Sequence, residues 1–216
     1  AFSADGRLVA AAMDNGKLFI WEAETGEEQA KLTPKDSLIA SAFSNDSFSA
    51  LAFSPDSALI AAGGLRSAFV WDVATRKQFF ELPLEDQLLD IAFSPDGSNL
   101  LATASWAGKV RLWDSATGEE LHVFEAGDRV ARLAFSADGR FLLTGGAVGH
   151  IWDVNSYEEI ATLPHDGYLL SVAFAPDGAL VATASTDHIA SIWDATTGEE
   201  VHTFQHQGRV EDIVFS

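Results

Sequence analysis

A tryptophan followed by an acidic residue occurs five times along the chain, and each copy closes a run that opens with phenylalanine. The five tryptophans are Trp21, Trp71, Trp113, Trp152 and Trp193. The opening phenylalanines are Phe2, Phe53, Phe93, Phe135 and Phe174, and a sixth, Phe215, stands near the end. Each Phe lies 17 to 20 residues before its Trp. A unit of about 40 residues repeated at a constant spacing is the mark of a repeat architecture.

One unit reads as four short β-strands without any helical period. In residues 167–204, an apolar run at 169–174 ends at Ala-Pro-Asp-Gly, a combination that favours a tight turn. Further strands are expected at 179–185, 189–193 and 199–204, the last with alternating polar and apolar residues. Four antiparallel strands per unit predict an all-β fold, a β-propeller whose blades are these units.

The motifs of the third unit resemble those of the WD-repeat β-propeller family. They are Phe-Ser-Pro-Asp-Gly from Phe93, Leu-Ala-Thr-Ala-Ser from Leu101 and Val-Arg-Leu-Trp-Asp from Val110. The resemblance extends over the whole chain and implies a propeller. It says little about function, because this fold hosts many unrelated roles.

We expect a single WD-repeat domain over residues 1–216, with five repeats and the start of a sixth. The resemblance suggests a fragment of a larger propeller of about seven blades. The alternative is a five-bladed ring closed by the tail. The expected segments are repeat units at 1–33, 49–82, 88–125, 130–163 and 168–204, an inserted loop at 35–48, and an inner strand of the next or closing blade at 205–216.

The family resemblance also implies a buried polar network in the fifth unit. Its expected members are His165, Ser185, Asp187 and Trp193. Serine, histidine and aspartate also suggest a hydrolase triad, but the chain has no Gly-x-Ser-x-Gly elbow. A structural network is therefore the favoured interpretation.

Composition excludes several classes of function. The chain has 13 basic and 32 acidic residues, a net charge of −19, which argues against nucleic acid and anionic membranes as ligands. A partner steered by this charge would be basic. Without cysteine, and with six scattered histidines, no metal or other cofactor is expected. No apolar stretch is long enough to span a membrane; the compartment is not fixed, although a cytoplasmic location is favoured.

These observations favour a non-catalytic scaffold that binds a protein or peptide on one loop face. Trp106 is the tryptophan outside the repeat positions, and aromatic and Arg side chains are common interface anchors. The candidate binding residues are Trp106, Arg66, Arg129, Tyr168, His188 and Arg209. A regulatory or sensory domain of a larger bacterial signalling protein is the alternative. A propeller enzyme is less favoured, because no unit has an acid or His pair beyond the periodic ones.

Overall fold

The computed structural model describes residues 1–13, 16–34 and 48–216, and the regular elements of this part are β-strands in five antiparallel sheets. The first sheet contains β1 (Leu8–Ala12), β2 (Leu18–Glu22) and β3 (Glu28–Leu32), and the second contains β4 (Ala50–Phe53), β5 (Leu59–Gly63), β6 (Ser67–Asp72) and β7 (Gln78–Pro83). The third contains β8 (Leu88–Phe93), β9 (Leu100–Ser105), β10 (Lys109–Asp114) and β11 (Glu120–Glu125). The fourth contains β12 (Arg132–Phe135), β13 (Phe141–Gly145), β14 (Gly149–Asp153) and β15 (Glu159–Leu163), and the fifth contains β16 (Leu169–Phe174), β17 (Leu180–Ser185), β18 (Ile189–Asp194) and β19 (Glu200–Gln205).

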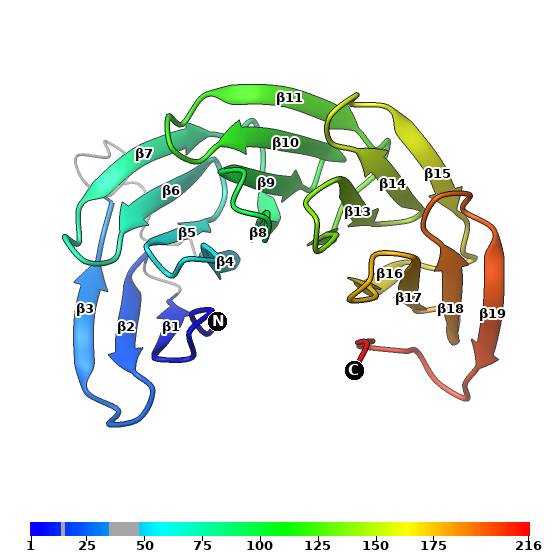
Figure 1. Cartoon of the computed structure of the whole chain (residues 1–216), viewed down its shortest axis with the longest axis horizontal. Helices are drawn as coiled ribbons and strands as arrows, with labels where there is room; N and C mark the ends of the chain where they lie inside the picture. Colours follow the sequence, from blue (N-terminus) through cyan, green and yellow to red (C-terminus); the bar gives the residue numbers. More distant parts are fainter. Residues whose placement is uncertain (14–15, 35–47) are drawn as a thin grey trace.

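The sheets follow one another along an open arc (Figure 1). Strands β4, β8, β12 and β16 lie on the inner side of the arc, and β3, β7, β11, β15 and β19 lie on the outer side. The predicted all-β fold is confirmed, and four of the five sheets have the expected four antiparallel strands. The first has three, and Phe2 adds only an isolated bridge to Val9. The two chain ends lie on either side of the opening in the arc.

The tail was expected to be the inner strand of the next or closing blade, at 205–216. In the structure Gln205 ends β19, and residues 206–216 pair with no strand. The backbone N–H of Val210 nevertheless donates to the carbonyl of Ser185 (3.0 Å), as Leu169 does to Gly146 (2.8 Å). The tail is therefore placed like the start of an inner strand, but it has no neighbouring strand to complete a ladder.

The predicted insertion at 35–48 lies outside the described residues, apart from Phe48. The ring of Phe48 meets that of Trp71 edge to face, with centroids 6.2 Å apart. The second copy of the Phe-Ser motif supplies β4, which pairs with β5.

The core lies between neighbouring sheets, where the tryptophan of one sheet covers small and aliphatic side chains of the preceding sheet. Trp113, for example, shares a buried cluster with Ala61, Val70 and Leu82. Small residues allow this approach, since a Cβ on Gly63 would lie 2.8 Å from the Leu88 side chain. Large side chains beside small ones give close packing.

Aspartates hold the turns of each sheet. In one turn, Asp56 accepts hydrogen bonds from the Ser54 hydroxyl (2.6 Å) and the Ala58 backbone (3.0 Å). Asp194, which follows a repeat tryptophan, accepts from Thr196 and from the Thr197 backbone N–H. These bonds favour the ionised form. The Ser54 hydroxyl lowers the pKa of Asp56, and Thr196 lowers the pKa of Asp194 to about 2.

These aspartates predict that the protein loses stability in acid. A carboxyl whose pKa is lower in the folded state than its ordinary value of about 4 stabilises the fold while it is ionised. That stabilisation is complete above pH ~4 and is lost as the pH falls through the folded values, which reach about 2 for Asp194. We expect the urea midpoint to fall steadily between about pH 4 and about pH 2, as estimated from these ranges. A midpoint independent of pH over this range would contradict the assignment.

Candidate functional site

Loops from successive sheets meet on one face of the arc. Trp106 lies in the loop between β9 and β10, and its backbone N–H donates to the carbonyl of Gln87, in the segment leading into β8 (2.9 Å). The fifth sheet repeats this contact, because the N–H of Thr186 donates to the carbonyl of Tyr168 (2.9 Å). The loop between the second and third strands therefore lies against the segment that leads into the first strand of the same sheet.

Trp106 and Arg129 form a stacked pair on this loop face. Trp106 is 54% exposed, and the guanidinium carbon of Arg129 lies 4.6 Å from its ring centroid. The side chain of Arg129 is half-buried, and its Nε is a buried donor without a hydrogen-bond partner in the described structure. A Cβ on Gly146 would lie only 2.2 Å from the carbonyl of Arg129, so glycine allows the two segments to approach.

No hydrogen bond, ion pair or ring contact of the described residues joins the other four candidates to this pair. Arg66 and His188 are exposed in loops, and Tyr168 is exposed before β16. Arg209 forms an ion pair with Glu211 in the tail. Among the six candidate residues, the contacts of the described chain join only Trp106 and Arg129.

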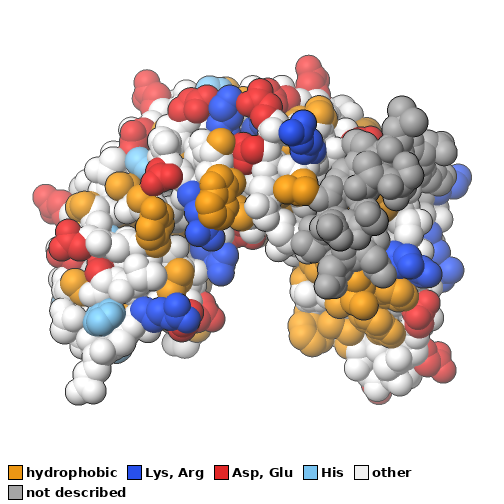
Figure 2. All heavy atoms as spheres, turned by 180° about the vertical axis from the view of Figure 1, so that it is seen from behind, with side chains coloured by type: hydrophobic (Ala, Val, Ile, Leu, Met, Phe, Trp, Pro, Cys, Tyr) orange, Lys and Arg blue, Asp and Glu red, His pale blue; other side chains and the backbone are white. Residues whose placement is uncertain are grey.

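Sequence analysis missed Arg132, an exposed side chain at the start of β12. Figure 2 shows basic and hydrophobic side chains next to each other along the inner side of the arc, whereas acidic side chains cluster at its outer edge. The sequence could have indicated this exposure, because neighbouring strand residues point to opposite faces. Leu133 is buried, so Arg132 lies on the face away from the core.

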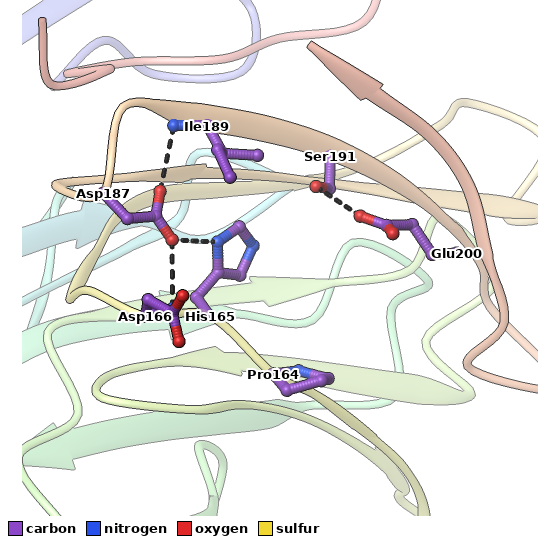
Figure 3. A pocket seen from close by; sticks show the side chains of 7 residues that line it. All are labelled: Pro164, His165, Asp166, Asp187, Ile189, Ser191 and Glu200. Carbon is purple, nitrogen blue, oxygen red and sulfur yellow. Dashed lines mark hydrogen bonds and ion pairs between the residues drawn. The ribbon is translucent and has the colours of Figure 1, made fainter. Parts of the chain in front are cut away.

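A separate polar network ties the segment between β15 and β16 to the fifth sheet, and Figure 3 shows its His165–Asp187 pair. His165 Nδ1 lies 2.9 Å from Asp187 Oδ2, and His165 Nε2 lies 2.8 Å from the hydroxyl of Thr183. Trp193 Nε1 donates to the same hydroxyl (2.8 Å). With the Nδ1 proton directed at the carboxylate, the Thr183 hydroxyl donates to Nε2, which gives an unbroken chain of hydrogen bonds.

The hydroxyl between His165 and Trp193 belongs to Thr183, which sequence analysis did not name. Ser185 contacts the other end of the network: its hydroxyl accepts from the backbone N–H of Asp187 (3.2 Å), and a hydrogen bond from its side chain helps to lower the pKa of the Asp187 carboxyl. The sequence contained a signal for Thr183, because two other units also have a threonine in the second strand, opposite the strand that carries the tryptophan. Trp113 donates to Thr103 (2.9 Å) and Trp152 to Thr144 (3.2 Å).

This geometry favours the interpretation of the network as a structural brace. Thr183 is fully buried, and its hydroxyl already contacts Trp193 and His165. Burial raises the pKa of the Asp187 carboxyl, but hydrogen bonds from His165 and from the Ile189 backbone outweigh burial and hold the pKa below its usual value. A cavity of about 180 Å³ lies beside His165, but the hydroxyl of Thr183 does not line it.

His165→Ala is expected to lower the free energy of unfolding by about 1–3 kcal/mol, because it leaves buried polar partners unpaired. The matched control is His206→Ala. His206 stands nine residues before Phe215, as His165 stands nine before Phe174, but it is exposed. Thermal melting should separate the two variants, and equal melting temperatures would contradict the brace.

A larger cavity, of about 360 Å³, lies between turns of the second and third sheets. Its carboxylates, Asp56 and Asp96, are held by hydrogen bonds within their own turns. Within the described residues, no group of three His, Asp or Glu side chains is placed to hold a metal ion. No helix in the described part of the chain is long and apolar enough to span a membrane.

The comparisons with known proteins agree with this architecture. The family model described as "WD domain, G-beta repeat" matches residues 31–72, 79–114, 118–153 and 157–194, more than half of the chain. No curated protein sequence matches. Each matched unit begins in or just before an outer strand and ends at the acid after the next repeat tryptophan. One sequence repeat therefore spans the junction between two sheets.

Proposed function

Because the chain belongs to the WD-repeat family, we propose that it is a non-catalytic scaffold that binds a protein or peptide on its loop face. Trp106 is the proposed anchor, and Arg129 is its immediate neighbour. Tyr168, His188, Arg66 and Arg209 are proposed to line the same face.

The exposed ring of Trp106 is the observation that supports this proposal. Tryptophan is among the residue types most enriched at the energetic centre of protein interfaces. The repeat itself does not require a tryptophan at this position, since the corresponding loop of the fifth sheet begins with Thr186. The WD-repeat framework places such loops on a rigid support, and family members commonly act as protein-interaction scaffolds.

The experiment compares partner capture by the wild type and by the double variant Trp106→Ala, Tyr168→Ala. We expect recovery of the bound protein to fall about tenfold or more, as for loss of an interface anchor. The control is Phe79→Ala, Leu121→Ala, which removes side chains of similar exposure from the outer strands β7 and β11. Equal capture by wild type and by the loop-face variant would refute the proposed site.

A further inference from the structure

We infer that the Trp106–Arg129 pair recognises a carboxylate that lies next to an apolar side chain in the partner. This inference rests on the proposed function, because it assigns the chemistry of the ligand at the same loop face. Arg129 would bind the carboxylate, and the exposed part of Trp106 would cover the apolar side chain.

The first argument is the unused bonding capacity of Arg129. Its buried Nε lacks a hydrogen-bond partner, and its guanidinium forms no ion pair within the described residues. Other basic side chains do find acids, as Arg111 does in Glu85 and Glu120. A buried donor without a partner is unfavourable unless a ligand supplies an acceptor.

The second argument is the orientation of the pair. Stacking on Trp106 holds the planar guanidinium in place, so that less freedom is lost when a ligand binds. An arginine fork matches the two oxygens of a carboxylate. The tryptophan is still 54% exposed after this stacking, which leaves ring surface for an apolar side chain.

The third argument concerns charge. The net charge of −19 by itself favours a basic partner. At physiological salt, however, charges more than about 8 Å away are largely screened, so the local surface governs recognition. Two acids lie near the pair. Asp128 accepts from the backbone N–H of Arg129 (2.7 Å), and Asp86 accepts from the backbone N–H of Ala107 (3.2 Å). In the described part of the chain, neither forms an ion pair with the guanidinium of Arg129. The inner side of the arc carries basic and hydrophobic side chains (Figure 2).

Peptide selection tests the inference and does not require an identified partner. Two random peptide libraries are panned against the full chain, one with internal peptides and one with free C-termini. We expect peptides enriched in Asp or Glu beside an aromatic or aliphatic residue, or in an apolar residue at a free C-terminus. The library that yields them identifies the carboxylate as a side chain or a chain end.

Titration of the best peptide then tests Arg129 itself. Replacing the peptide carboxylate by an amide should weaken binding to the wild type about tenfold or more, as for a charge-assisted hydrogen bond. The same replacement should have almost no effect on binding to Arg129→Gln, because the two changes remove one contact. Arg140→Gln is the control and should behave as the wild type, since Arg140 lies over the ring of Phe141 in the turn between β12 and β13 and pairs with Asp153.

The outcomes separate this inference from the proposed function. Peptides that need Trp106 but contain no acidic group, or that bind Arg129→Gln unchanged, would overturn the carboxylate assignment and leave the loop-face scaffold in place. Basic peptides would overturn it in the same way. Recovery of no peptide that depends on Trp106 would overturn both.

Discussion

Replacing Trp113 by alanine is expected to lower the free energy of unfolding by about 3–5 kcal/mol, the usual cost of removing a large aromatic side chain from a core. Trp113 is 2% exposed and packs against Val70 and Leu82 of the preceding sheet. It also donates to the hydroxyl of Thr103, which would lose its partner. Urea unfolding followed by far-UV circular dichroism measures the effect.

Trp21→Ala is the matched control for this variant. Trp21 occupies the same place in its repeat, but it is only half-buried and lies on a face of the first sheet that no described sheet covers. Its loss should cost less than about 1.5 kcal/mol, since little cavity is created. Should Trp113→Ala fail to fold, Trp113→Phe keeps a ring and loses the hydrogen bond, with an expected cost of about 1–3 kcal/mol. Equal costs for Trp113→Ala and Trp21→Ala would contradict sheet-to-sheet packing as the main source of stability.

Much of the fold is predictable from sequence because the same local sequence pattern occurs in every unit. Apolar strands, aspartate-containing turns and the Trp-Asp ending recur at fixed spacing, so one unit defines the others. Each matched family unit spans two sheets and ends just after a tryptophan that packs against the preceding sheet. This holds also for the longer unit 31–72, whose Trp71 shares a buried cluster with Ile20 and Leu32.

The details that sequence analysis missed depend on which face of a strand a side chain occupies. Thr183 and Ser185 are two residues apart and lie on the same face of β17, so alternation alone does not choose between them. The register does: Thr183 pairs with Ser191, two residues before Trp193, which brings its hydroxyl to the indole nitrogen. The register is known only when the strands are paired.

The candidate site was predictable only in part for a similar reason. Trp106 departs from the repeat pattern, and sequence alone marks it. Its contact with Arg129 joins a loop inside the third sheet to the segment between the third and fourth sheets, and the distance between two such segments follows from how whole sheets pack. The absence of a strand at 206–216 has the same origin, because a strand exists only beside a partner.

The second prediction with a large effect concerns the phenylalanine of an outer strand that packs against the tryptophan of the next sheet. Phe124→Ala is expected to cost about 3–5 kcal/mol, because Phe124 is 2% exposed and its ring packs against Trp152 of the next sheet, with centroids 5.1 Å apart. The control is Phe204→Ala. Phe204 holds the same position in β19, opposite Ala190 as Phe124 is opposite Val110, but it is 49% exposed.

We expect Phe204→Ala to cost less than about 1 kcal/mol, because half of this ring already contacts water. Urea unfolding of the two variants, measured at the same protein concentration, gives the comparison. A cost for Phe204→Ala that approaches that for Phe124→Ala would mean that this face of the fifth sheet is covered in solution, contrary to the open arc. A small cost would mean that stability resides in the junctions between sheets, so that the outermost faces contribute little to it.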